Sequence, residues 1–420
     1  MSAADRDELS AAFREEWPKI LATLIRATGS VELAEDSVQE AFVRAIASRD
    51  RALLINPAAW VTTVAKRIAI DSIRRDAAMS RRLPLLHAPL HEAEMETGYG
   101  PAGDDRLSLL FLACAPELTP ESRLALALRF VCGVSTEAIA DALLVEHTAM
   151  SARLTRAKKR IAHDDIRFVM SGDGATDDRL DDVLSTVYVL YTTGHSAPFG
   201  SPLGAKSGAT RTAIELARSL RKLRPNDREV AGLLSLLLLT EARATTRLTQ
   251  DGALVTLEDA DRGLWDASGI REGLDLAVEA LPGGGRFALQ AGIAGLHAEA
   301  PSWATTDWTA IGALYDRLLA IWPSPAAALA RIVARSYGPP GPMTALGELS
   351  ELEPSLSGLT GRQAVAVRAD LLRRSGRTTE ARSLYERARD LEKHPPTRDF
   401  FGRRIAELDA VKPLGLGRQP

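Results

Sequence analysis

The sequence predicts an all-α protein with several domains. Apolar residues recur at helical spacing along nearly all of the 420 residues, and hydrophobic residues make up 45% of the chain, which is enough for sizeable cores. Aromatic residues are scarce at 5%, whereas Ala, Leu and Arg are abundant, a composition that favours packed helices over sheets. The length predicts two or three domains.

Breaks in composition divide the chain into segments. A stretch with three prolines and three glycines lies between Arg82 and Asp104, and seven aspartates fall between Asp164 and Asp182. We therefore expect a helical domain over 5–80, a flexible linker over 81–104, a second helical domain over 105–163, an acidic junction over 164–180, a larger helical domain over 181–410 and a disordered tail over 411–420.

The first domain contains a helix with two different faces. In AEDSVQEAFVRAI, an apolar face recurs at helical spacing and is expected to be buried; it consists of Ala34, Val38, Ala41, Phe42 and Ala45. The opposite face is acidic and polar, because Asp36, Gln39 and Glu40 stand at i, i+3 and i+4. This face is a candidate surface for a basic partner.

A basic helix follows in PAAWVTTVAKRIAIDSIRRDAAMSRR. Six Lys/Arg residues lie between Trp60 and Arg82, against two aspartates. Positive charge with an aromatic side chain suits an opened nucleic-acid strand, although Trp60 is equally compatible with a place in the core. The candidate nucleic-acid residues here are Trp60, Lys66, Arg67, Arg74 and Arg75.

The stretch EAIADALLVEHTAMSARLTRAKKRI predicts two short helices joined by a tight turn. Its second helix has five Lys/Arg residues between His147 and Ala162 and no acidic residue, although the whole chain has a net charge of −3. A basic helix behind a short supporting helix is typical of a DNA-binding helix-turn-helix. Ser135 is a plausible N-cap of the first helix, whereas Leu144 occupies the usual glycine position of the turn and Glu146 the second cap.

The recognition helix is expected to bury one face and present the other to DNA. Met150, Leu154, Ala157 and Ile161 are spaced to face the core. Residues near the helix start are placed to read bases, whereas the later cations are placed to hold phosphates. The candidate DNA-binding residues are His147, Thr148, Ser151, Arg153, Thr155, Arg156, Lys158 and Lys159.

The order of these motifs resembles the sigma-70 family of bacterial RNA polymerase sigma factors, in its small extracytoplasmic-function type. DSVQEAF is similar to the region 2.2 signature, WVTTVAKRIAIDSIRR to regions 2.3–2.4, and the stretch from Leu118 to Ile161 to region 4. The resemblance covers roughly residues 5–162. It implies that the acidic face docks on the β′ clamp helices of core RNA polymerase, with the β flap as a further contact, and that promoter DNA is the other partner.

The same resemblance assigns roles to the two basic surfaces. The first domain would open and read the −10 element, with the segment 48–56 capturing a flipped base, and the helix-turn-helix would read the −35 element. Two other functions stay open: a helix-turn-helix regulator with a repeat-type sensor domain, and a helical scaffold that binds a protein partner. Neither requires DSVQEAF or the basic helix after it.

The C-terminal half resembles the extension of a sigma-factor subgroup with a tetratricopeptide-repeat-like domain, which implies regulation in cis, with a regulatory partner or ligand possible. Small or apolar residues recur at repeat-like spacing in Ala369, Leu372, Gly376, Ala381, Tyr385 and Ala388. The run from Glu258 to Asp266 fits either a ligand site or a helix start with local ion pairs. We also consider that the acidic junction or the following domain covers the DNA-facing surface of the helix-turn-helix.

The sequence offers little for catalysis, metals or membranes. GSPLGAKSG lacks the spacing of a phosphate loop, there is no nucleophile elbow, and the seven histidines show no metal-ligand spacing. The two cysteines form no disulfide framework, no apolar run is long enough to span a membrane, and the polar N-terminus does not resemble a signal peptide. We expect a cytoplasmic protein that is not an enzyme and needs no cofactor or metal.

Overall fold

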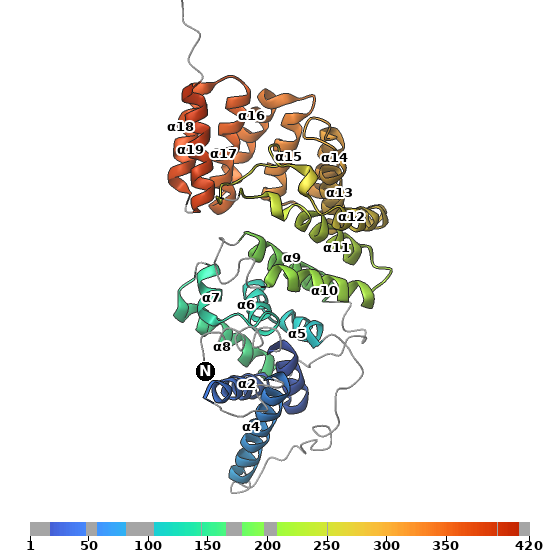
Figure 1. Cartoon of the computed structure of the whole chain (residues 1–420), viewed down its shortest axis with the longest axis vertical. Coiled ribbons are helices and arrows are strands. Elements are labelled where there is room, and N and C mark those ends of the chain that lie inside the picture. Colours follow the sequence, from blue (N-terminus) through green and yellow to red (C-terminus); the bar gives the residue numbers. More distant parts are fainter. Residues whose placement is uncertain are drawn as a thin grey trace, which may run out of the picture. The chain divides into compact units, whose positions relative to one another are not determined.

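The computed structural model describes residues 17–47, 57–80, 105–143, 145–164, 179–196, 208–249, 251–392 and 394–410. Within these ranges the chain is helical and forms no strand; a single antiparallel bridge joins Leu248 and Leu254 (Figure 1). The all-α prediction is therefore confirmed. The chain divides into two compact units, Met1–Leu223 and Arg224–Pro420.

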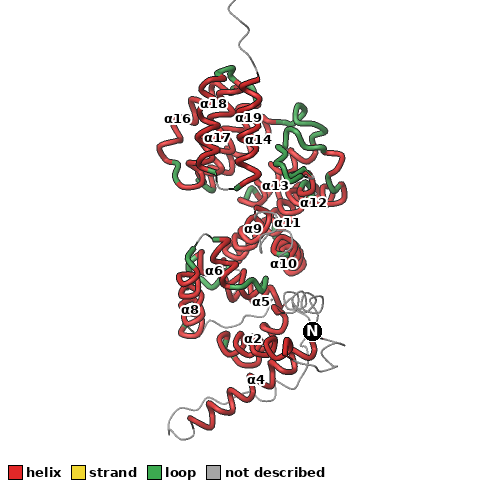
Figure 2. Tube along the Cα trace, turned by 60° about the vertical axis from the view of Figure 1, so that its left-hand side comes forward, coloured by secondary structure: helices red, strands yellow, loops and turns green. Residues whose placement is uncertain are grey.

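The described part of the first unit is made of helices (Figure 2). Its first described helix covers residues 17–28. The helices that follow are α2 (Val31–Ala47), α4 (Pro57–Ser80), α5 (Asp105–Ala113), α6 (Pro120–Phe130), α7 (Thr136–Ala142), α8 (His147–His163), α9 (Leu180–Ser196) and α10 (Ala209–Leu223).

Small residues set the packing of α2 on α4. The apolar face of α2 is buried, as its helical spacing predicts; it consists of Ala34, Val38, Ala41, Phe42 and Ala45. It meets α4, whose Val61, Ala65 and Ala69 recur every fourth residue and are completely buried. Alanine at these positions lets the two helices approach closely, and the polar faces of both helices are left toward solvent.

The second unit is a succession of helices in which each packs on the next along the chain. Short 3₁₀ turns occur at Ala244–Thr246, Arg262–Leu264, Leu281–Gly283 and Glu353–Ser355. The α-helices are α11 (Arg228–Glu241), α12 (Ala267–Ala280), α13 (Arg286–Glu299), α14 (Trp308–Ile321), α15 (Pro325–Tyr337), α16 (Gly341–Leu352), α17 (Gly358–Arg374), α18 (Thr378–Leu391) and α19 (Pro395–Ala410).

The repeat-like spacing near the C-terminus corresponds to the helix pair α17–α18. Ala369 and Ala381 are completely buried, and the buried Tyr385 packs in the same hydrophobic cluster as Ala369. Gly376 lies between the helices with φ +77°, a conformation that favours glycine, so the turn is tight enough to fold α18 back onto α17. A helix hairpin with small residues at its crossing is therefore present.

Three of the expected segments lie outside the described residues. They are the linker 81–104, most of the acidic junction 164–180 and the tail 411–420. The expected domain bounds stay predictions, and the compact units divide elsewhere, since α9 and α10 belong to the first unit rather than to the helical array.

Candidate polymerase and nucleic-acid interface

The acidic face of α2 is accessible. Asp36, Gln39 and Glu40 are all exposed, on the side of the helix opposite the buried alanines. The Glu40 carboxylate pairs with Arg44 one turn later at 2.9 Å, an exposed pair that leaves both groups open to solvent. The face is therefore available to a partner and is not part of the first-domain core.

Two apolar side chains extend this face. Val43 and Ile46 are 59% and 56% exposed, and Val43 follows Gln39 and Glu40 by one helical turn. Exposed large aliphatic side chains beside an acidic face are typical of a binding surface. Helical spacing already places Val43 on the polar side of α2, so the sequence contained this signal. We call Asp36, Gln39, Glu40, Val43 and Ile46 the docking face.

The basic helix α4 presents its cations unevenly. Arg67, Arg74 and Arg75 are exposed, whereas Trp60 and Lys66 are partly buried. The Arg75 side chain donates from Nε to the backbone oxygen of Asp71 at 3.1 Å, which holds it along the helix surface. The segment 48–56, expected to capture a flipped base, lies outside the described residues.

The helix-turn-helix forms from α7 and α8, with α6 behind them. The Ser135 hydroxyl accepts a hydrogen bond from the Ala138 amide at 3.2 Å, so this residue caps α7 as the sequence predicts. Glu146 stands at the cap of α8 without a side-chain cap hydrogen bond. Leu144, in the turn, is outside the described residues. The four residues expected to anchor α8 are all buried, namely Met150, Leu154, Ala157 and Ile161.

The outer face of α8 carries the other candidates. Thr148, Ser151 and Thr155 are exposed polar residues, and Arg156 and Lys159 are exposed cations. At the helix start, Nε2 of His147 donates a hydrogen bond to the Asp141 carboxylate at 2.8 Å. That hydrogen bond raises the pKa of His147 above its ordinary value, so the ring carries positive charge at a higher pH than a free imidazole. Arg153 and Lys158 are partly buried.

Known proteins match the chain along these same segments. Residues 12–78 match the family described as Sigma-70 region 2, and residues 108–161 match the family described as Sigma-70, region 4. A probable ECF RNA polymerase sigma factor, SigI of Mycobacterium tuberculosis, is 26% identical over 163 residues, which cover 38% of this chain and 56% of that protein.

The chain belongs to the sigma-70 family. It carries a C-terminal extension, of which residues 179–281 match a family of unknown function, DUF6596. An uncharacterized protein of Rhizobium meliloti (strain 1021) is 38% identical over 381 residues, covering 88% of this chain and 89% of that protein. The match therefore spans the extension as well as the two sigma regions.

Region 2 and region 4 are joined by a buried ion cluster. Glu35 of α2 is only 3% exposed, and its carboxylate accepts from Arg129 Nε of α6 at 2.7 Å and from Lys158 Nζ of α8 at 3.0 Å. Burial alone raises the pKa of Glu35, but Arg129 and Lys158 together outweigh burial and hold the pKa below its ordinary value. The carboxylate is therefore charged at neutral pH.

The sequence did not reveal this cluster. Glu35 lies at the rim between the buried and exposed faces of α2, next to Asp36, and nothing local shows that a distant helix covers it. Its partners are 94 and 123 residues away in the chain. Lys158, expected to contact DNA, is thus paired within the protein.

Region 4 is also attached to the start of the extension. The side chain of Arg123 in α6 forms an ion pair with Asp182 of α9, and Arg106 Nη1 of α5 pairs with Glu215 of α10 at 2.6 Å. The Cys114 thiol donates to the Thr186 hydroxyl at 3.2 Å, and burial raises the pKa of this thiol to about 12. The first two helices of the extension are therefore packed on region 4.

The candidate ligand run 258–266 is mostly occupied by structural contacts. Asp261 and Asp266 accept backbone hydrogen bonds as helix caps, and the Trp265 indole donates to Thr246 at 2.9 Å. Arg262 donates to the carbonyl of His297 in the last turn of α13 and to that of Ala300 at its C-cap. These contacts support the helix-start interpretation over the ligand site.

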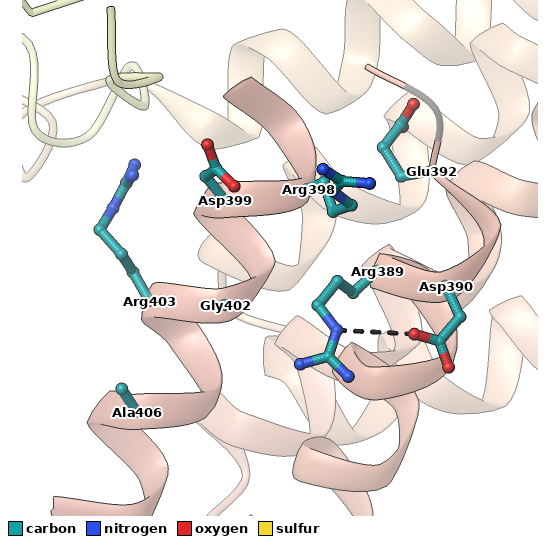
Figure 3. A pocket seen from close by; sticks show the side chains of 8 residues that line it. All are labelled: Arg389, Asp390, Glu392, Arg398, Asp399, Gly402, Arg403 and Ala406. Atoms are coloured by element: carbon teal, nitrogen blue, oxygen red, sulfur yellow. Dashed lines mark ion pairs between the residues drawn. The ribbon is translucent and has the colours of Figure 1, made fainter. Parts of the chain in front are cut away.

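A cavity of about 730 Å³ lies between the end of α18 and α19 (Figure 3). Its walls carry three cations and three anions, and Arg389 pairs with Asp390 at 3.5 Å. Balanced charge favours no class of ion. The lining residues are Arg389, Asp390, Glu392, Arg398, Asp399, Gly402, Arg403 and Ala406.

The described residues form neither a metal-binding cluster nor a membrane-spanning helix. In the described ranges, no three His, Cys, Asp or Glu side chains are grouped so that they could hold a metal ion. Of the helices in those same ranges, none combines the length and the apolar composition needed to cross a membrane.

Proposed function

We propose that this chain is a sigma factor that joins core RNA polymerase and directs promoter-specific initiation of transcription in the cytoplasm. One observation carries the proposal: the acidic docking face of region 2 is exposed while the region 4 recognition helix presents exposed cations and hydroxyls. The polymerase performs the chemistry, so the chain itself needs no catalytic residue. The β′ clamp helices and the β flap are the expected polymerase contacts.

The docking face, α4 and α8 each bind a different part of the initiation complex. The docking face binds the polymerase through complementary charge and through Val43 and Ile46. Arg67, Arg74 and Arg75 of α4 hold the opened −10 strand, with Trp60 and Lys66 beside them. The α8 residues from His147 to Lys159 occupy the −35 major groove, where the later cations bind phosphates and Thr148, Ser151 and Thr155 approach bases.

A charge reversal tests polymerase binding. The double variant Asp36→Lys/Glu40→Lys changes two exposed side chains, so the fold should persist while association with core polymerase is lost. Asp275→Lys/Glu279→Lys is a matched control, since it reverses an exposed i, i+4 acidic pair on α12 in the second unit. Promoter-dependent transcripts with purified core and a −10/−35 template are the readout.

The alternatives give different results in the same assay. A helix-turn-helix regulator would bind promoter duplex without core polymerase, and the charge reversal at Asp36 and Glu40 would not change that binding. A protein-binding scaffold would yield neither transcripts nor duplex binding. Transcripts that survive the charge reversal would contradict the assigned role of the docking face.

We propose further that the extension regulates the sigma regions in cis. Support comes from the contacts of α9 and α10 with α5 and α6, which attach the extension directly to region 4. A truncation before α9 would strip these contacts, so it would not report on regulation alone. A protease site inserted in the turn 224–226 allows the helices from α11 onward to be cut from the rest of the chain after folding. Transcription should change on cleavage; a chain without the site, treated with protease, is the control.

A further inference from the structure

Glu35 is a charged carboxylate buried by a different domain. Within region 2 alone it would lie at the rim of α2, beside the docking face, yet in the full chain it is 3% exposed. A buried charge is costly unless it is paired and hydrogen-bonded. Among the described residues, its two cationic partners, Arg129 and Lys158, both come from region 4, and Gln39 of the docking face adds a third donor at 3.1 Å.

A second contact supports the first. Trp17, in the first described helix of region 2, is completely buried. Its ring packs on Gly133, where a Cβ would lie 3.4 Å from the ring, and the Arg129 guanidinium stands 5.0 Å from the ring centroid. Arg129 therefore contacts two region 2 side chains, an aromatic ring and a carboxylate, and its Nη1 also donates to the Val134 carbonyl.

The Lys158 ammonium cannot pair with the Glu35 carboxylate and with a DNA phosphate elsewhere at the same time. It lies in the basic helix α8, among residues proposed to bind DNA phosphates, and it is held 3.0 Å from Glu35. Binding DNA with Lys158 therefore requires release from Glu35. Lys158 also acts on the docking face, since its charge partly offsets the rise that burial produces in the pKa of Asp36.

We propose that Glu35, Arg129 and Lys158 form a lock that holds region 2 against region 4 in the free chain, and that polymerase and promoter DNA must break this lock. The inference rests on the proposed function, because it assigns the opened state to the initiating complex. In the closed state Lys158, which is proposed to bind phosphate, is neutralised, and region 4 covers Glu35, the neighbour of Asp36 in the docking face. Opening exchanges the Glu35 carboxylate for a DNA phosphate at the Lys158 ammonium.

The distance between the two regions can be measured in the full chain. Cys114 and Cys132 are buried, and burial raises the pKa of each thiol to about 12, so neither competes for thiol-reactive labels. Thr63→Cys on α4 and Glu117→Cys after α5 place spin labels at exposed positions of region 2 and region 4. Pulsed electron paramagnetic resonance then gives the distribution of distances between the two spin labels.

The lock predicts a single narrow distribution of label-to-label distances in the otherwise unaltered chain. In Glu35→Gln the distribution should be broad and shifted to longer distances. Lys158→Met should open the chain in the same way from the other side. Glu32→Gln removes an exposed charge from the same helix and should leave the narrow distribution unchanged. An unchanged narrow distribution in both Glu35→Gln and Lys158→Met, with folding verified by circular dichroism, would overturn the lock.

Binding to a random-sequence DNA duplex separates the lock from the proposed function. Glu35→Gln should bind at least about tenfold tighter than the unaltered chain, because Lys158 is released to the phosphates. Glu32→Gln should tighten binding far less. If the chain opens in Glu35→Gln but neither it nor the unaltered chain yields promoter-dependent transcripts with core polymerase, the lock stands and the sigma function fails. Equal affinity of Glu35→Gln and Glu32→Gln would contradict the exchange at Lys158.

Discussion

Gly232 gives a prediction whose sign cannot be read from helix propensity. The residue lies inside α11, where alanine normally stabilises a helix by about 0.5–1 kcal/mol relative to glycine. A Cβ at this position, however, would lie 2.5 Å from the Ala288 amide nitrogen and 2.8 Å from the Phe287 carbonyl carbon, both in the backbone of α13. Backbone cannot rotate away, so Gly232→Ala must push the two helices apart.

The cost follows from what that separation breaks. Overpacking a core costs about 1–3 kcal/mol. The first turn of α13 is also held by Glu229 of α11, whose carboxylate accepts from the amides of Phe287 and Ala288, both at 2.9 Å. Hydrogen bonds to charged groups contribute roughly 1.5–3 kcal/mol each, and displacement would weaken both. After subtracting the helix-propensity gain, we expect a net destabilisation of about 2–3 kcal/mol.

Calorimetric unfolding of the full chain checks this value. The second unit has about 200 residues, for which 1 kcal/mol shifts Tm by about 2–4 °C, so Gly232→Ala should lower its Tm by roughly 5–10 °C. Gly347→Ala is the matched control, because Gly347 lies inside α16 with open space around its would-be Cβ. The control should raise Tm by roughly 1–4 °C. Unchanged or higher Tm in Gly232→Ala would refute the reasoning.

Three further predictions concern charge. Arg156→Ala and Lys159→Ala should each weaken DNA binding across sequences and reduce the slope of log affinity against log salt by about 0.9, measured by fluorescence anisotropy. The pKa of His147, measured by NMR, should lie above 6.5 and should fall in Asp141→Asn. Because the folded-state pKa is raised, the His147–Asp141 pair stabilises the fold at low pH, and this stabilisation is lost as the pH rises through the folded-state pKa. Burial lowers the pKa of His297 to about 4, so urea unfolding should show a loss of about 2 kcal/mol between pH 7 and pH 5, and His297→Asn should lose less.

Periodic features of this chain were predictable because helical spacing is a local property. The buried faces of α2 and α8 follow from apolar residues three and four positions apart, and every residue expected on them is buried. The Ser135 cap follows from the same local chemistry, since its hydroxyl satisfies an amide of the helix it begins. Asp36, Gln39 and Glu40 of the docking face follow from the same spacing, because they lie opposite the buried apolar face of α2.

Contacts between distant segments were not predictable in this way. Glu35 and Asp36 are adjacent acids on one helix, yet Glu35 is buried and Asp36 is exposed. Likewise, Gly232 and Gly347 both stand inside helices, and only the position of α13 distinguishes them. In each pair the two residues are of the same kind and stand in helices, and the difference comes from a helix elsewhere in the chain that packs on only one of them.

By itself, the sequence determined the helical class, the order of the two sigma regions and the residues that α2 and α8 turn inward. Short-range periodicity and capping are sufficient for these features. Tertiary structure alone decided that region 4 covers Glu35, that α9 and α10 pack on region 4, and that α11 approaches α13 at a glycine. Those outcomes depend on surfaces that meet across long stretches of chain, from 56 residues between Gly232 and Ala288 to 123 residues between Glu35 and Lys158, and no local pattern encodes such a meeting.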